Sequence, residues 1–553
     1  MHLNTSYLRG LALVCVTASF ALTALAAPPG MNSKAPEYSS QPFNRAAAIE
    51  QRDELHQWLM SGTVLNGLDH PVVAVFTGDE LAAVDNARGE DPMRVGLTRS
   101  LSVNVSFADL KISRLNGRTI QRGNGAITAT EDGGFVYTMA LSSPGAAALR
   151  VHFTGFRLPP ATGVYLYTDE TQAFGPYTGR GPLGDGEFWS NTVVGDYVIL
   201  QLRHVGPATD ADLHGAGFTV AGLGHVRPVF LAGTCSNNAS CTVNAECVNN
   251  TAVDPARDAV AAMQWISGAF IYFCSGGLVA DTDDSTKIPY FLTANHCISK
   301  GKDARNLENF FQFTKPCDST SACLTWQQLR DTWTQDLRTL GASIVSTGRG
   351  GDYTLLQLAE PAPDGSAFLG WDSTPVAFNN GTHLYRISHP GGAPQSYSAH
   401  TVDLSAPTCQ SWPRGERIYS HDVYGATEGG SSGSPVVNGN GEIVGQLSGA
   451  CGTNVNDVCD SAHNATVDGA FAYYFSQVSS YLDNGGGGCT ATETTETSCN
   501  DGVDNDCDGL IDNADSDCSS GGGGLPPGAH CMVDSDCASN SCSKGKPSTR
   551  VCN

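Results

Sequence analysis

The placement of its cysteines limits what this 553-residue chain can fold into. Cys15 stands alone near the start, and the other 18 of the 19 cysteines begin at Cys235. The stretch between them has none and must fold without covalent cross-links. An even number of cysteines in an exported chain favours disulfides over zinc ligands. The sequence therefore divides into a cysteine-free N-terminal part and a disulfide-bridged C-terminal part.

The first residues indicate export. Residues 11–24 form a short apolar run after Arg9, and ALA at residues 24–26 provides a small-x-small cleavage site, as in a cleaved secretory leader. We expect a signal peptide over residues 1–26 and a secreted protein. The run is too short to cross a bilayer, and no later segment has the length and apolar character of a membrane span. A formal net charge of -24 argues against a nucleic-acid partner, and we expect a monomer.

Glycine-rich and acidic segments mark further boundaries. In residues 27–232, apolar and alternating runs separated by Gly, Pro and Asp predict a β-sandwich, with one helix over residues 44–62. Residues 233–484 are also rich in predicted strands and end in a short predicted helix from Gln477. The tail is predicted to contain a Gly-rich linker (485–498), an acidic module (499–518), a second linker (519–530) and a Cys-rich module (531–553).

Residues 430–435 read GSSGSP and carry the strongest chemical signal. The pattern is G-x-S-G-S rather than the G-x-S-x-G of a nucleophile elbow. Glycines on both sides of Ser432 allow a tight turn that aims the N–H groups of Gly430 and Ser432 at one point, as oxyanion donors require. Read alone, such a segment is also ordinary Gly/Ser turn material.

Two earlier segments supply partners for this serine. His296 follows the apolar run YFLTA, where a strand exit would hold a general base in place. A disulfide between Cys297 and Cys274 would fix that exit to a neighbouring strand. Asp352 opens the apolar run YTLLQL and would orient the imidazole. The three candidate catalytic residues follow the order His, Asp, Ser, which separates one triad architecture from its convergent relatives.

These motifs resemble the trypsin-like serine proteases, and more closely their bacterial lysyl-endopeptidase branch. SCTVNAEC at residues 240–247 resembles the opening of that branch. The resemblance implies an all-β fold with a chymotrypsin-like double β-barrel over 233–484, preceded by a β-rich propeptide and followed by small Cys-rich modules. It implies peptide-bond hydrolysis through an acyl-enzyme without a catalytic cofactor. It also implies three disulfides, which are Cys274–Cys297, Cys247–Cys317 and Cys241–Cys451.

The resemblance also places a specificity pocket. Its predicted positions are Ala426, Thr427, Ser448, Gly449, Thr466 and Asp468. Lysyl enzymes carry an aspartate where this chain has Thr466, and Asp468 stands two residues later. Asp468 is either a pocket anion that attracts Lys or Arg, or an ordinary loop aspartate. Animal trypsins need an aspartate before the catalytic serine for activation, whereas this chain has Ser431, so we expect activation by propeptide removal alone.

The sequence does not specify which protease performs the activating cleavage. Arg227 is the only Lys or Arg between residues 203 and 257, and Pro228 follows it, which makes that bond a poor substrate. Either another protease releases the enzyme near Gly233, or the pocket accepts a residue such as Phe230 or Leu231.

The acidic module contains a predicted calcium loop. Its aspartates have the spacing of EF-hand ligands, with Gly509 at the sharp turn and the Leu510 carbonyl at position 7. The candidate Ca²⁺ ligands are Asp504, Asp506, Asp508, Leu510, Asp512 and Asp515. The module resembles a thrombospondin type 3 repeat. The tail is also compatible with an association of the secreted protein with the cell surface.

Two functions fit these features. The first is a secreted serine endopeptidase that acts on protein or peptide substrates and is made as a proenzyme. The alternative is a catalytically inactive protease fold that serves as a calcium-dependent adhesion or binding protein.

Overall fold

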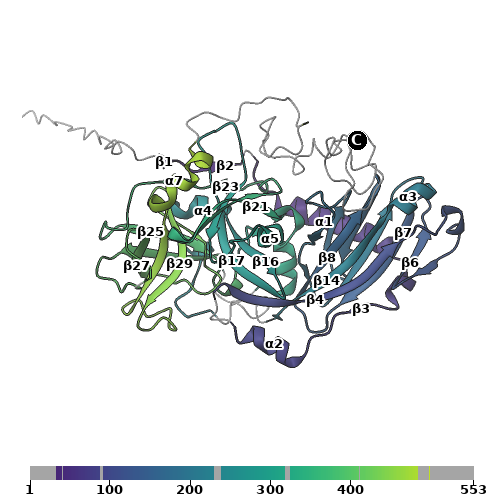
Figure 1. Ribbon diagram of the computed structural model, residues 1–553, viewed down its shortest axis with the longest axis horizontal. Helices are drawn as coiled ribbons and strands as arrows, with labels where there is room; N and C mark the ends of the chain where they lie inside the picture. Colours follow the sequence, from purple (N-terminus) through teal and green to yellow (C-terminus); the bar gives the residue numbers. More distant parts are fainter. Residues whose placement is uncertain are drawn as a thin grey trace, which may run out of the picture.

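The computed structural model describes residues 33–39, 41–87, 91–228, 238–317, 324–409, 411–483 and 497. Two β-rich units lie side by side, the N-terminal one in purple and blue and the C-terminal one in teal to yellow (Figure 1). The expected signal peptide, the domain boundary near Gly233 and the two tail modules lie outside the described residues. No helix in the described ranges is long and apolar enough to cross a membrane.

The N-terminal unit is the predicted β-sandwich. One layer has the strand order β10-β9-β13-β7-β6-β5, and the other contains β11-β8-β14-β4. Their apolar faces meet in one core, where Phe153 and Leu200 are fully buried. The strands are β3 (Val72–Val73), β4 (Met93–Ser106), β5 (Ile120–Arg122), β6 (Gly125–Ala129), β7 (Phe135–Ser142), β8 (Ala148–Arg157), β9 (Thr162–Tyr167), β10 (Ala173–Tyr177), β11 (Phe188–Trp189), β12 (Val193–Val194), β13 (Tyr197–His204) and β14 (Gly217–Val226).

Helices flank this sandwich. The helix predicted over 44–62 is confirmed as α1 (Arg45–Ser61), and the Asn44 side chain caps it by accepting from the Ala47 N–H. The other two helices are α2 (Gly78–Asp85) and α3 (Asp210–Gly215), each with a capping box.

The first barrel of the C-terminal unit holds two of the candidate catalytic residues. Its strands pair in the order β20-β19-β16-β17-β18-β22-β21. Because β20 and β21 are consecutive in the chain, the two ends of this order meet and the sheet curls into a barrel. The bounds are β16 (Val260–Ser267), β17 (Phe270–Leu278), β18 (Tyr290–Ala294), β19 (Glu308–Phe311), β20 (Arg338–Leu340), β21 (Ala342–Gly348) and β22 (Tyr353–Leu358), with α4 (Asp254–Ala259), α5 (Gly301–Arg305) and α6 (Trp326–Thr332) around them.

The second barrel closes through β29–β30 pairing, in the order β28-β25-β26-β27-β30-β29. The bounds are β25 (His383–Ser388), β26 (Ser396–Val402), β27 (Arg417–Tyr424), β28 (Pro435–Val437), β29 (Glu442–Gly452) and β30 (Asn464–Ala470). Shorter strands at the margins are β1 (Ser33–Lys34), β2 (Glu37–Tyr38), β15 (Val243–Asn244), β23 (Ala367–Phe368) and β24 (Gly370–Asp372). The predicted chymotrypsin-like double β-barrel is thus confirmed.

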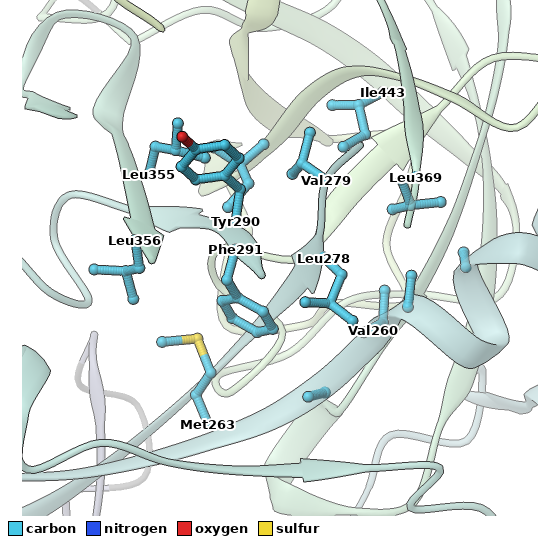
Figure 2. Packing of buried hydrophobic residues seen from close by; sticks show 14 of the residues in the cluster. Val260, Met263, Leu278, Val279, Tyr290, Phe291, Leu355, Leu356, Leu369 and Ile443 are labelled. Carbon is cyan, nitrogen blue, oxygen red and sulfur yellow. The ribbon is translucent and has the colours of Figure 1, made fainter. Parts of the chain in front are cut away.

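The C-terminal helix begins earlier than the sequence predicts. It is α7 (Phe471–Leu482) rather than a helix from Gln477, because Phe471, Tyr474, Val478 and Leu482 recur at helical spacing and are all buried. They join the core of the first barrel, in which Phe291, Leu355 and Met263 pack together (Figure 2). The helix thereby packs against strands of both barrels, β21 of the first and β29 and β30 of the second.

The two units share one sheet. Strand β4 pairs with β14 of the sandwich and with β17 of the first barrel, so a single 12-stranded sheet runs through both units. In the same sheet, the fully buried Glu308 of β19 accepts a hydrogen bond from Arg338 at 2.9 Å and lies 3.5 Å from Arg150 of the N-terminal unit. It also accepts from the Thr192 N–H. The carboxylate therefore links both units.

Four disulfides join described cysteines. They are Cys241–Cys459, Cys247–Cys317, Cys274–Cys297 and Cys409–Cys451. The implied pairing Cys241–Cys451 is wrong. Cys409 lies in the loop after β26 and packs beside Cys451 in a cluster with Tyr419, so it takes Cys451 and leaves Cys241 to Cys459.

Candidate active site

His296 lies just past the end of β18, all of whose residues are buried. The Asn295 N–H donates to the Asp352 carbonyl at 3.0 Å. The disulfide expected between Cys297 and Cys274 is present and ties the His296 loop to β17. The strand and these two links fix the point from which the imidazole projects.

Asp352 contacts His296 through both carboxylate oxygens. Its Oδ2 lies 2.8 Å from His296 Nδ1, and its Oδ1 accepts from the His296 backbone N–H at 3.0 Å. The Asp352 backbone has φ of +52°, a conformation that is costly for a residue with a side chain. Gln446 Nε2 donates to the Asp352 carbonyl at 2.9 Å, and the Tyr474 hydroxyl donates to Gln446 Oε1. This chain of contacts from α7 stabilises the conformation.

Ser432 lies in the loop between β27 and β28, and β17 holds this loop in place. The Ser275 N–H donates to the Ser432 carbonyl at 2.9 Å, and Ser275 Oγ donates to the Gly430 carbonyl at 2.8 Å. Gly433 has φ of +82°, and a Cβ there would lie 2.2 Å from Thr293 Oγ1. Only glycine fits at this position, which explains the second glycine of the motif.

The two predicted oxyanion donors keep their N–H groups free of backbone partners. Within the described ranges, neither the Gly430 nor the Ser432 N–H donates to a backbone carbonyl. Gly430 has φ of +95°, and Ser431 next to it is fully buried and accepts a hydrogen bond from Ser388. The serine that replaces the activating aspartate of animal trypsins is therefore part of an internal hydrogen bond.

A carboxylate from the N-terminal unit also enters the site. Ser432 Oγ donates to Asp91 Oδ1 at 2.9 Å, and His296 Nε2 lies 3.1 Å from the same oxygen. Burial lowers the pKa of His296, but hydrogen bonds to Asp352 and Asp91 outweigh it and raise the pKa to about 10. The structure therefore brings the three predicted catalytic side chains together with a fourth group.

The predicted pocket residues lie on neighbouring segments. Ser448 and Gly449 are on β29, Thr466 and Asp468 are on the adjacent β30, and Ala426 and Thr427 precede the serine loop. Leu447 is opposite Asp468 in the β29–β30 register.

Asp468 is not an ordinary loop aspartate, because it is fully buried on β30. Its carboxylate is paired with the buried Arg386 of β25. Arg386 also donates to the Ser434 carbonyl at 2.8 Å. The negative charge of Asp468 therefore has a partner inside the protein and supports the serine loop.

A second carboxylate reaches the predicted pocket. Asp422, on β27, accepts a hydrogen bond from Thr466 Oγ1 at 2.6 Å and lies 2.7 Å from His400 Nδ1. Burial raises the pKa of Asp422, but the contacts with His400 and Thr466 lower it by a larger amount. The net shift of the pKa is therefore downward. Asp422 is therefore ionised at neutral pH beside one predicted pocket residue.

The site holds no thiolate for a metal. Cys274, His296 and Cys297 lie close together, but the two sulfurs form a disulfide and cannot act as thiolate ligands. The predicted calcium ligands (Asp504, Asp506, Asp508, Leu510, Asp512 and Asp515) lie outside the described residues.

Sequence reasoning missed Asp91, Asp422, Gln446 and Tyr474. Each reaches the site through pairing of distant strands or through helix packing, and none belongs to a motif. The helical spacing of the aromatic residues in α7 indicates its early start. That signal could have identified Tyr474 as a residue on the buried face.

Two comparisons of the sequence match lysyl endopeptidases. A family model described as "Lysyl endopeptidase, C-terminal domain" matches residues 233–464. The lysyl endopeptidase of Pseudomonas aeruginosa is 27% identical over 336 residues, which cover 58% of this chain and 69% of that protein.

Two solved protease structures are also similar. The Rv3671c protease from M. tuberculosis in its active form has 16% identity and a TM-score of 0.28, over 44% of this chain and 88% of that one. The HtrA-type protease AlgW with a tripeptide has 15% identity and a TM-score of 0.28, over 42% of this chain and 63% of that one. The fold assignment rests on the strand pairing above, and the sequence matches relate this chain to bacterial serine proteases.

Proposed function

We propose that this chain is a secreted serine endopeptidase that is made as a proenzyme. The observation that carries the proposal is a shared contact. His296 Nε2 and Ser432 Oγ face the same Asp91 oxygen, while Asp352 binds the other ring nitrogen of His296. A peptide carbonyl in the place of the Asp91 carboxylate would lie within reach of both groups. The matches to lysyl endopeptidase support the assignment.

The chemistry follows from these positions. Ser432 Oγ attacks the carbonyl carbon of the substrate, and His296 Nε2 accepts the hydroxyl proton. His296 then gives this proton to the leaving amine, which leaves an acyl group on Ser432 that water removes in the same way. Asp352 holds the ring and stabilises its cationic form. The N–H groups of Gly430 and Ser432 stabilise the negative oxygen of each tetrahedral intermediate.

We propose that the substrate side chain before the cleaved bond is basic. Asp422 is ionised and contacts Thr466, which takes the place of the aspartate of lysyl enzymes. Its charge would attract a Lys or Arg side chain that lies against Thr466. Asp468 is less suited to this role because Arg386 already neutralises it.

We propose that the N-terminal unit is a propeptide and that the tail binds Ca²⁺. The propeptide role is supported by the insertion of Asp91 into the site. Calcium binding rests on the aspartate spacing at residues 504–515. Calorimetry on the whole chain tests it, and Asp506→Ala with Asp508→Ala is expected to abolish the heat of binding at millimolar Ca²⁺. A wild-type chain that releases no heat would exclude the site.

Labelling of Ser432 tests the enzymatic function. The processed chain is treated with a fluorophosphonate, and mass spectrometry locates the label. Label on Ser432, with none on a Ser432→Ala chain, is the expected result. A processed, folded chain that takes no label would instead favour the inactive adhesion or binding protein.

A further inference from the structure

Asp91 contacts the catalytic centre from a distant part of the chain. It is 341 residues away from Ser432 in sequence, yet its Oδ1 accepts a hydrogen bond from Ser432 Oγ at 2.9 Å. The same oxygen lies 3.1 Å from His296 Nε2. One carboxylate oxygen therefore engages both groups that must act on a substrate.

This contact removes the catalytic function of both groups. A serine hydroxyl that donates to Asp91 does not donate to His296, so its proton has no path to the base. The His296 ring lies between Asp91 and Asp352, and the resulting pKa of about 10 keeps it protonated at neutral pH. A protonated imidazole cannot accept the proton of the nucleophile.

The backbone that follows Asp91 blocks the neighbouring surface. Met93 begins β4 and pairs with Phe273 of β17, directly before Cys274 of the active-site disulfide. An extended substrate could add to this edge of β17 only if β4 were absent. The Met93 side chain is buried, and its Cε lies 3.2 Å from the Cβ position of Gly430, one of the predicted oxyanion donors.

From these contacts we infer that Asp91 is an inhibitory residue, which holds the intact chain inactive by occupying the Ser432–His296 pair while Met93 covers the oxyanion loop. This inference rests on the proposed function and specifies how the same site is regulated. It places the block in the segment Asp91–Met93 rather than in the bulk of the N-terminal unit. A change at this one side chain should therefore raise the reactivity of Ser432 without cleavage.

The test measures labelling of the intact chain. A small fluorophosphonate is added to freshly purified protein, and the rate of label incorporation is read from the uncut band on a denaturing gel. The variants are Asp91→Ala, which removes the carboxylate, and Asp91→Asn, which keeps its shape. Asp169→Asn is the matched control, because Asp169 is an exposed aspartate of the same unit that follows β9.

Asp91→Ala is expected to raise the labelling rate of the uncut chain about 10- to 100-fold, the range expected for loss of hydrogen bonds to a charged group. Asp91→Asn should give a smaller increase, and Asp169→Asn none. The Asp91 side chain is 42% exposed, so its removal opens no cavity in the core, and any loss of thermal stability should reflect only the lost contacts with His296 and Ser432. As a second readout, NMR of labelled histidine should show a lower His296 pKa in both Asp91 variants.

Two results distinguish an error in the role of Asp91 from an error in the proposed function. If the processed chain is labelled but uncut Asp91→Ala reacts at the wild-type rate with an unchanged His296 pKa, the role of Asp91 is wrong and the proposed function stands. If neither the processed chain nor any variant is labelled, the proposed function itself fails, and the inhibition with it.

Discussion

Asp352 binds His296 twice, through Oδ2 to the ring Nδ1 at 2.8 Å and through Oδ1 to the backbone N–H at 3.0 Å. An asparagine has only one oxygen to serve both donors. Asp352→Asn should therefore lower kcat of the processed enzyme by about 10⁴-fold, as loss of the correct tautomer does in triads of this type. The rate of peptide hydrolysis measures the effect. Asp364→Asn is the control, because Asp364 is exposed. Near-normal kcat in Asp352→Asn would exclude Asp352 from the triad.

Tyr474 supports the triad from α7. Its hydroxyl donates to Gln446, which in turn donates to the carbonyl of Asp352. Tyr474→Phe keeps the ring stacked on Tyr353 but removes the donor. We expect kcat to fall several-fold at unchanged KM, since only the position of Asp352 is loosened. Tyr473→Phe is the control, because that ring is 49% exposed. A change in KM alone would contradict the positioning role.

Glu308 should be important for the stability of the intact chain. It is fully buried between Arg338 and Arg150, so Glu308→Gln leaves two buried cations without their anion. The free energy of unfolding should fall by about 3 to 5 kcal/mol, as expected when one partner of a buried ion pair is removed. Urea unfolding measures this loss. Glu187→Gln, on an exposed pair with His152, should change stability by less than about 1 kcal/mol. Equal effects for both variants would refute the role.

The protonation of His296 should differ between intact and processed chains. In the intact chain its pKa is raised to about 10, so the stabilisation from its charged contacts is fully present below pH 6.5 and is lost as the pH rises through 10. The facing groups are Asp352 and Asp91, and only Asp91 leaves on processing. NMR titration of labelled histidine should therefore show a lower pKa in the processed chain. Identical titration curves would mean that Asp91 does not contribute.

Asp422 should set the substrate preference. Asp422→Asn removes the charge but keeps an acceptor for Thr466. We expect kcat/KM for Lys and Arg substrates to fall about 10- to 100-fold, with little change for apolar ones, because one charged contact is lost. Cleavage of a peptide library by both enzymes gives the comparison, and Asp403→Asn serves as control at a half-buried aspartate paired with His421. A wild-type preference for Leu or Phe would contradict the assignment and would fit self-cleavage near Phe230.

Local sequence indicates the three candidate catalytic residues but not the long-range contacts around them. His296, Asp352 and Ser432 each lie in a motif whose glycines, cysteine or apolar run have a local physical meaning. The pairing of β4 with β17 joins positions about 180 residues apart, and no local pattern specifies such a register. Asp91 therefore went unnoticed, although the all-β class was readable from the strand pattern.

The sequence also did not indicate the charge partners of buried groups. Asp468 was predicted to be either a pocket anion or a loop aspartate, but the sequence did not indicate its partner Arg386, which lies 82 residues earlier on another strand. The same is true of the disulfides. The Cys274–Cys297 bridge follows from its local setting, whereas Cys409 and Cys459 changed the partner of Cys241 because the loops that carry them fold onto the second barrel.

The shared strand β4 has a consequence for the solubility of the processed enzyme. If the N-terminal unit is removed as proposed, residues Phe270–Phe273 of β17 would lose their neighbour β4 and become an edge with unpaired N–H and C=O groups. The edge is apolar and aromatic, the composition most prone to pairing with another copy. If the N-terminal unit is the propeptide proposed above, its β4 strand would protect the molecule against self-association until a substrate strand takes its place.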